Sequence, residues 1–356
     1  MPETSPAHET SLPGKDVIDR ADPRALIWDL VRGQWRFSAL YAFVDLDLAG
    51  WLRDGPLSVS ELAQRSGFDR GALARLLRTA AGLSVVRTVT STSGPNRYAL
   101  TAAGETLRGD VHRSMRSVVI PQGTPHFLEA MGSLAEAVRI GKSPFAARYG
   151  SMYAYLEGHP EARHHFDAHM ATRSRSIAEA VVVEYDFSGI GTIADIGGGV
   201  GTILATILRA CPGLRGLLFE LEAVIAGARE FLLSEGVADR CELLSGDFFT
   251  SVPTADAYVL SNIVHNWGDE DALRILQNLR AVIPDDGRVL LLDILLPADD
   301  RPHLGKELDM RMLALYDGAL ERTREDYLAL LSRAGLRTSQ VIELPYALSL
   351  IEARPA

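Results

Sequence analysis

Cysteine is scarce in this sequence: only Cys211 and Cys241 occur among its 356 residues, and they do not form a CxxC pair. So few cysteines predict neither a disulfide framework nor a zinc site built from thiolates. Basic residues are also in deficit, with 36 Lys and Arg against 46 Asp and Glu and a net charge of −10. A protein that mainly binds nucleic acid needs a basic surface, so that function is not expected.

Long apolar runs are missing as well. No uninterrupted apolar segment approaches the roughly 20 residues that span a membrane. The N-terminal "MPETSPAHETSLPGKDV" lacks the apolar segment of a signal peptide. Its polar, proline-rich composition instead predicts a disordered leader over residues 1–16. Together these absences predict a cytoplasmic protein that does not bind membranes.

The length of the chain and its 47% hydrophobic content indicate more than one domain. Apolar residues recur at helical spacing over residues 22–52, which indicates one or two amphipathic or buried helices. After them, Ser58 and Asp69 are placed to cap two short helices. The polar turn "STSGPN" then separates the strand-like "VVRTVT" and "RYALT". This order predicts a mainly helical winged-helix domain over residues 17–110.

The remainder of the chain changes character near its middle. Residues 111–182 are mostly helical in pattern and are predicted to form a connector. Over residues 183–356, helices alternate with the short apolar strands "TIADIG", "LRGLLFE", "CELLSGD", "DAYVLSNIV", "RVLLLDILL" and "ALSLIEA". This alternation predicts an α/β domain with a parallel sheet covered by helices, which binds ligands at the carboxyl ends of its strands.

The first of these strands runs into "DIGGGVGTILATIL", where Asp195 precedes a cluster of glycines that includes Gly197 and Gly199. Glycines let the backbone turn sharply and approach a ligand closely. A dinucleotide fingerprint places a third glycine where this chain has Thr202, so nicotinamide binding is not predicted.

Polar side chains also follow the next two strands. Glu220 ends the second strand, where a carboxylate can accept hydrogen bonds from ribose hydroxyls. Asp247 and Phe248 end the third strand and suit the amino group and the ring face of adenine. Each of these residues alone is more often a solvated or packing residue, but three such strand ends in series indicate a cofactor site.

At this point the sequence resembles the class I S-adenosylmethionine-dependent O-methyltransferases of the plant caffeate type and their bacterial natural-product relatives. The resemblance covers Asp22 to the C-terminus and rests on "DIGGGVGTIL", "FELEAVI", "SGDFF", "NIVHNWGDED", "LLLDILLP" and "LERTREDYLALLSRAGL", in the order of the family. It implies a Rossmann-like S-adenosylmethionine methyltransferase domain and an N-terminal winged-helix domain that forms a homodimer. It also implies S-adenosyl-L-methionine as cofactor and S-adenosyl-L-homocysteine as product.

The resemblance assigns roles to individual residues. Those expected to bind the cofactor are Asp195, Gly197, Gly199, Glu220, Asp247, Phe248 and Ser261. The plant pattern usually has Asp in place of Glu220 and Lys in place of Ser261. The acceptor pocket is expected to include residues of segment 111–182, and Met170 and Met310 occur where the family builds this pocket, although core packing explains both methionines nearly as well.

His265, in "NIVHNWGDED", is predicted to be the general base. A phenol is mostly protonated at neutral pH, and a neutral imidazole can accept its proton as the methyl group is transferred. Such a histidine works best when its other nitrogen donates to a carboxylate. The resemblance implies that Asp293 and Glu321 flank it. A lone histidine at a strand end more often packs or caps, but the cofactor motifs and both acids favour catalysis.

The neighbouring acids Asp269, Glu270 and Asp271 suit the start of a helix and are predicted to cap it. His165 and His169 lie one helical turn apart, but no HExxH pattern or further ligand cluster accompanies them, so no metal site is predicted.

These observations predict an enzyme that methylates a phenolic hydroxyl of an aromatic small molecule, in bacterial natural-product biosynthesis. Two alternatives stay open. One is an enzyme of the same fold that methylates nitrogen or carbon or does not transfer a methyl group. The other is a cofactor-sensing regulator that binds DNA through the winged helix, for which Arg70, Arg75 and Arg78 would suit phosphate contacts. Glu61 and Asp69 dilute that positive charge.

Overall fold

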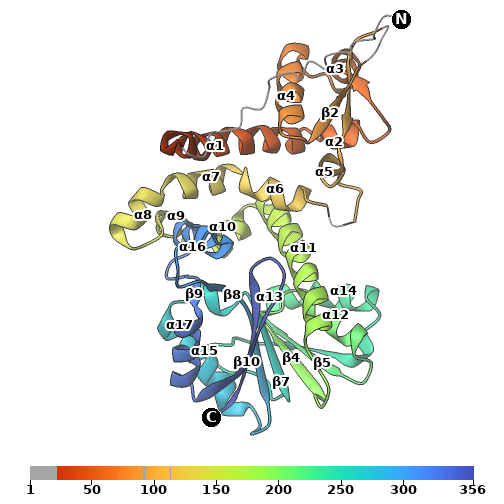
Figure 1. Cartoon of the computed structure of the whole chain (residues 1–356). Coiled ribbons are helices and arrows are strands. Elements are labelled where there is room, and N and C mark those ends of the chain that lie inside the picture. Colours follow the sequence, from red (N-terminus) through yellow and green to blue (C-terminus); the bar gives the residue numbers. More distant parts are fainter. Residues whose placement is uncertain (1–21, 91–93, 113) are drawn as a thin grey trace, which may run out of the picture. The chain divides into compact units, whose positions relative to one another are not determined.

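The computed structural model describes residues 22–90, 94–112 and 114–356 (Figure 1). Two compact units divide the chain, residues 1–120 and 121–356. The predicted leader, residues 1–16, lies outside the described residues. The segment predicted as a connector is shared between the units, because α6 (Arg116–Gln122) crosses the boundary between them.

The first unit contains the predicted helix-turn-helix and wing. Its elements are α1 (Pro23–Asp45), α2 (Leu48–Trp51), β1 (Leu57–Ser58), α3 (Val59–Ser66), α4 (Arg70–Gly82), β2 (Val86–Val89), β3 (Arg97–Leu100) and α5 (Ala102–Glu105). Both predicted caps are confirmed, because Ser58 forms a capping box with Glu61 at the start of α3 and Asp69 accepts from the Ala72 N–H at the start of α4. The strands form an antiparallel sheet in the order β1-β3-β2.

Helix α1 differs from the amphipathic or buried helix that its spacing indicates. Phe43 and Val44, near its C-terminal end, are buried in the core of the unit. In contrast, Trp28, Leu30 and Trp35 are 59–67% exposed. The first turns of α1 therefore present large apolar side chains that the described residues leave exposed.

The second unit is built on a seven-stranded path of one mixed sheet, in the order β10-β11-β8-β7-β4-β5-β6. Its strands are β4 (Thr192–Ile196), β5 (Arg215–Glu220), β6 (Cys241–Ser245), β7 (Ala257–Ser261), β8 (Arg288–Leu296), β10 (Leu336–Glu343) and β11 (Leu348–Pro355), and the short β9 (Arg322–Thr323) pairs with β8. Strands β4 to β8 are parallel, as predicted.

The prediction of a parallel sheet is wrong for the last two strands. β11 runs antiparallel to β8, and β10, which the sequence analysis missed, runs antiparallel to β11. The sequence of β10, "LRTSQVIE", is largely polar and four of its eight residues are exposed. An edge strand of this kind lacks the continuous apolar run of a buried parallel strand.

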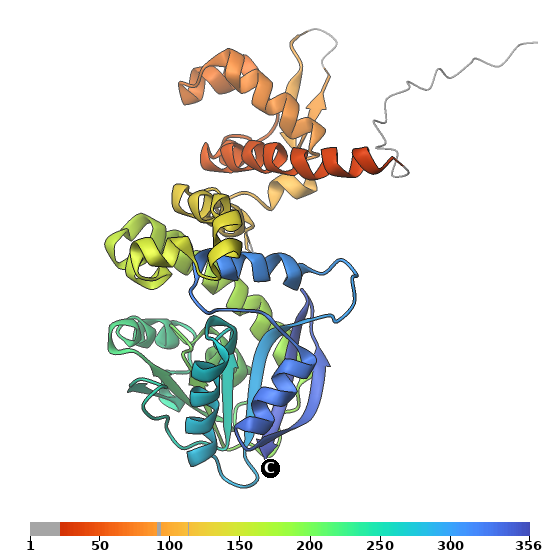
Figure 2. The ribbon, with the colours of Figure 1, turned by 90° about the vertical axis from the view of Figure 1, so that its left-hand side faces the viewer.

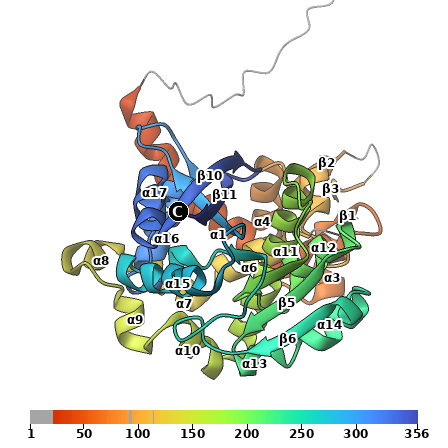
Figure 3. The ribbon, with the colours of Figure 1, turned by 90° about the horizontal axis from the view of Figure 1, so that it is seen from below.

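Helices cover both faces of the sheet, as Figure 3 shows from below. On one face, apolar side chains of α11 (Pro160–Glu184), α12 (Thr202–Ala210), α13 (Glu222–Ile225) and α14 (Ala228–Ser234) share a core with the sheet. On the other face, α15 (Asp269–Val282) and α17 (Arg324–Arg333) do so. The 3-10 turns η1 (Ala238–Arg240) and η2 (Val264–Asn266) precede β6 and α15.

A further group of helices lies over the carboxyl ends of the parallel strands (Figures 1 and 2). It comprises α7 (Pro125–Gly132), α8 (Leu134–Ile140), α9 (Pro144–Tyr149), α10 (Met152–Gly158) and α16 (Leu304–Leu315). These helices share a small apolar core of their own that includes Phe145, Met152 and Leu315. Within the described ranges, no helix combines the length and the apolar character needed to cross a membrane.

Candidate active site

The glycine turn lies at the carboxyl end of β4. Gly197, Gly199 and Gly201 have φ angles of +69°, +61° and +88°, in the left-handed region that favours glycine. A Cβ on Gly197 would lie 2.7 Å from Ile263 and 3.6 Å from Phe248. The turn thus closely approaches the segments that follow β7 and β6, and any side chain at Gly197 would displace them.

Two carboxylates border this turn. Glu220, at the end of β5, accepts hydrogen bonds from the N–H groups of Gly199 (3.1 Å) and Leu221 (2.8 Å). Asp195 is 1% exposed, and neither of its carboxylate oxygens has a hydrogen-bond partner among the described residues. Burial, and then the negative charge of Glu220, raise the pKa of Asp195 to about 7. A buried carboxylate without partners indicates a ligand that brings positive charge or hydrogen-bond donors.

The other predicted cofactor residues lie at neighbouring strand ends. Asp247 is exposed and accepts from the Phe249 N–H at 2.8 Å. Phe248 stands edge-on to Trp267, with ring centroids 6.1 Å apart. Ser261 ends β7, and its Oγ accepts from the side-chain amide of Asn262 at 3.0 Å. All predicted cofactor residues therefore lie in or directly after the four adjacent strands β7, β4, β5 and β6.

His265 lies in η2 and is 4% exposed. Its Nδ1 is 3.0 Å from Oε1 of Glu321. A carboxylate can only accept, so Nδ1 donates and Nε2 is left as the acceptor of the neutral ring. The Glu321 backbone N–H in turn donates to Asp309 of α16 at 2.9 Å. The two predicted partners, 56 residues apart in the sequence, are thus brought together in a buried pair.

Asp293 lies near this pair but does not hydrogen-bond to it. It is fully buried within β8, which continues three residues further to Leu296. Its Oδ2 accepts from the Tyr327 hydroxyl at 2.8 Å. Burial raises the pKa of Asp293 to about 6, with His265 lowering it and Glu321 raising it. Glu321 therefore supplies the hydrogen bond to His265, and Asp293 is bonded to Tyr327 instead.

The residue next to Glu321, Arg322, was not predicted to belong to the site. It is 1% exposed and donates to the carbonyl oxygens of Val264 (3.1 Å) and Trp267 (2.8 Å), on either side of His265. It also donates to the Asp269 carboxylate at 2.7 Å. Arg322 thus fixes the backbone of the turn that carries His265.

The acids that open α15 have a different role from the predicted one. The residue that caps α15 is Gly268, and no side chain caps it. Asp269 instead pairs with Arg322, and Glu270 pairs with Arg333 of α17 at 2.7 Å. Their position in the first turn of α15 is as predicted, but Asp269 and Glu270 use their charge to bind arginines.

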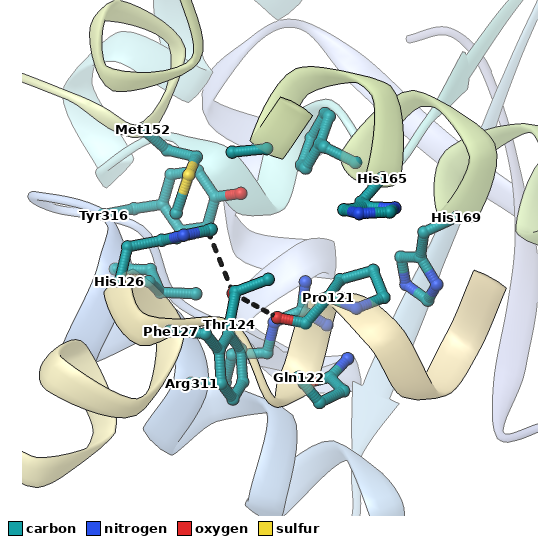
Figure 4. A pocket seen from close by; sticks show the side chains of 13 residues that line it. Pro121, Gln122, Thr124, His126, Phe127, Met152, His165, His169, Arg311 and Tyr316 are labelled. Carbon is teal, nitrogen blue, oxygen red and sulfur yellow. Dashed lines mark hydrogen bonds between the residues drawn. The ribbon is translucent and has the colours of Figure 1, made fainter. Parts of the chain in front are cut away.

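A cavity lies in the helical layer above the strand ends. Side chains of α7, α10, α11 and α16 contribute to its lining (Figure 4). They include His126, Phe127, His165, His169, Arg311 and Tyr316. Met170 and Met310 do not line this cavity: Met170 is half-buried and Met310 is 40% exposed. His165 and His169, one turn apart on α11, contribute to the lining instead.

The chain was compared with known proteins. A family model for the O-methyltransferase domain matches residues 131–337, and one for the O-methyltransferase dimerisation domain matches residues 28–110. Phenazine O-methyltransferase PhzM of Lysobacter antibioticus is 36% identical, over 93% of this chain and 96% of that protein. The 8-amino-8-demethylriboflavin N,N-dimethyltransferase of Streptomyces davaonensis is 39% identical, over 83% and 85%.

Among solved structures, CalO1, a methyltransferase in calicheamicin biosynthesis crystallised in its SAH-bound form, superimposes with a TM-score of 0.83. It is 37% identical, and the match covers 95% of this chain and 99% of that one.

Proposed function

Because the chain belongs to the S-adenosylmethionine-dependent O-methyltransferase family, we propose that it methylates a phenolic hydroxyl of an aromatic small molecule in bacterial natural-product biosynthesis. The observation that carries this proposal is the buried pair of His265 and Glu321, with Nδ1 and Oε1 3.0 Å apart. This pair leaves Nε2 as an acceptor for the proton of a hydroxyl group.

The cofactor supplies an activated methyl group on a sulfonium, which is also the leaving group. The residues proposed to hold it are Asp195, Gly197, Gly199, Glu220, Asp247, Phe248 and Ser261. Their chemistry suits this molecule: Asp195 and Glu220 offer negative charge to a cation and acceptors to hydroxyl groups, and the glycine turn leaves room for close approach.

We assign the general base to His265 and the orienting carboxylate to Glu321. The neutral imidazole takes the phenolic proton during methyl transfer, and the resulting imidazolium is stabilised by Glu321 at Nδ1 and by the nearby charge of Asp293. The protein must also align the hydroxyl oxygen with the methyl group, since in-line geometry supplies much of the rate in such displacements.

N-methylation is the second candidate function. It is favoured by the N,N-dimethyltransferase relative, which is 39% identical. The two reactions differ in their need for a base, because an aromatic amine attacks through a lone pair that it already has, whereas a phenol must lose its proton.

The test is transfer of labelled methyl from S-adenosylmethionine to phenols and to the matching anilines. We expect phenols to be converted to methyl ethers with equimolar release of S-adenosylhomocysteine. Methylation of the anilines alone would overturn the proposal in favour of N-methylation.

We also propose that the enzyme is a homodimer assembled through α1. Large apolar side chains are concentrated and exposed in the first turns of α1, as at an interface, and residues 28–110 match the dimerisation domain. Dimerisation accounts for the presence of a winged-helix domain, so that no DNA-binding role is needed to explain it.

Substitution of Leu30 by Asp is expected to convert the dimer to a monomer, because it places a charge in the apolar interface. The matched control is Leu233→Asp, at a leucine of α14 with similar exposure. Light scattering coupled to size-exclusion chromatography measures both masses. A dimer that persists in Leu30→Asp, or a wild-type monomer, would contradict this proposal.

A further inference from the structure

The cavity in the helical layer has an unusual charge for this protein. None of its thirteen lining residues is Asp or Glu, although the chain carries ten more acidic than basic residues. Four of them, His126, His165, His169 and Arg311, bear imidazole or guanidinium groups. The lining of this cavity therefore carries a positive charge, that of Arg311, in a protein that is acidic overall. It also offers several nitrogen atoms that can donate hydrogen bonds.

Arg311 is the permanent charge in this pocket. It is half-buried, and its Nε is buried without a hydrogen-bond partner. Within residues 22–90, 94–112 and 114–356 it makes no ion pair, and its guanidinium lies over the ring of Phe127, with Cζ 5.7 Å from the ring centroid. A partly buried guanidinium without a counter-charge is costly, so the position indicates a ligand that supplies the negative charge.

A second arginine adds to this field. Arg173 of α11 makes no ion pair within the described part of the chain either. Burial and the charge of Arg311 lower its pKa, while Glu321 and Asp293 raise it. Arg173 is therefore near enough to Arg311 and to the acids Glu321 and Asp293 to interact with each of them through its charge.

The helix that carries Arg311 also bonds the backbone of Glu321, and aromatic side chains contribute to the lining of the cavity. Asp309 of α16 holds the backbone of Glu321, and Arg311 follows two residues later on the same helix. Phe127, Phe166 and Tyr316 contribute aromatic surfaces to the lining. A ligand that places a ring between such surfaces combines stacking with recognition of one charged substituent.

We propose that the acceptor is an aromatic phenol that carries a carboxylate, and that Arg311 binds this carboxylate. The inference rests on the proposed function, because it identifies the ligand of this pocket with the methyl acceptor. A guanidinium can bind a carboxylate through two parallel hydrogen bonds, which also fixes the orientation of the ring relative to His265.

The test compares hydroxybenzoates and hydroxynaphthoates with their primary amides, which keep the shape and remove the charge. Binding is measured by calorimetry in the presence of S-adenosylhomocysteine, and methylation is measured on the same pairs. We expect the acid to bind about tenfold or more tightly than the amide, as suits one charge-assisted bidentate contact. Arg311→Gln should abolish this preference by weakening acid binding and leave the amide unchanged.

The matched control is Arg148→Gln, which removes an arginine that also lies over an aromatic ring, that of Tyr149, but is outside the cavity lining. It should keep the preference for the acid. Arg311→Lys retains the positive charge but lacks the paired N–H groups of the guanidinium, so it should keep part of the preference for the acid. A misfolded variant would lose binding of both the acid and the amide.

An acid preference that survives Arg311→Gln, or equal binding of acid and amide to the wild type, would overturn the inference. Because binding is measured separately, a wild type that binds acids through Arg311 but methylates none of them contradicts the proposed function and not the anion site.

Discussion

Replacement of His265 by alanine is expected to slow methyl transfer to a phenol about 10²–10⁴-fold, the usual contribution of a general base. The reason is that the phenolic proton loses its acceptor, Nε2 of a ring held by Glu321. Binding of S-adenosylhomocysteine should be unchanged, because His265 is not among the proposed cofactor residues and its Nδ1 is paired with Glu321 rather than with any of them. Single-turnover transfer of labelled methyl and calorimetry measure the two quantities.

The companion substitution is Glu321→Gln, which keeps the shape of the side chain and removes its charge. It should lower the rate about 10–100-fold by weakening the stabilisation of the imidazolium, and the loss should be greatest with the least acidic phenols. Glu325→Gln, the same change at an exposed position of α17, is the control. If His265→Ala binds cofactor and methylates phenols as fast as the wild type, His265 is a packing residue and the proposed mechanism is wrong.

Substitution of Arg322 by Met is expected to lower the free energy of unfolding by about 3 kcal/mol, since several buried hydrogen bonds lose their donor. The carbonyl groups of Val264 and Trp267 lose this donor, and within the described residues only the Val264 carbonyl keeps another hydrogen bond, from the Trp267 N–H at 3.2 Å. The turn that carries His265 should then lose its fixed position, so kcat should fall more than the affinity for cofactor.

Arg333→Met provides the matched control. Arg333 also pairs with an acid in the first turn of α15, but its side chain and that of Glu270 are exposed to solvent. Exposed ion pairs contribute about 0–1 kcal/mol, so this variant should unfold close to the wild type and keep its activity. Urea denaturation and kinetics on both variants measure the difference. Equal effects of the two substitutions would show that Arg322 has no special role in the turn.

Local chemistry explains which parts of the fold were predictable. The caps at Ser58 and Asp69 depend on contacts within four residues, and the glycine turn after β4 depends on a backbone conformation that few other residues adopt. The five parallel strands have the apolar runs that buried strands require. The residues that produce each of these features are close to it in the sequence.

Other features depend on distant partners and were missed. Arg322 looks like a solvated residue in the sequence, because arginine is rarely buried unless it is paired, and its partners lie more than 50 residues away. β10 is polar because it occupies an edge of the sheet. The lining of the cavity comes from five separate helices, so no spacing rule identifies Arg311 or distinguishes lining residues from Met170 and Met310.

The residues proposed to bind the cofactor precede the end of the catalytic pair in the sequence, and this order has a consequence for synthesis of the protein. The residues proposed to bind the cofactor all lie between positions 195 and 261, on four strands that neighbour one another. The hydrogen-bond partner of His265 comes from Glu321, and Arg322 donates to the backbone on either side of it. Because a chain is made from its N-terminus, the pieces of the cofactor surface leave the ribosome before the catalytic pair is complete. A nascent or truncated enzyme that ends before residue 320 would thus hold the cofactor residues without a working base.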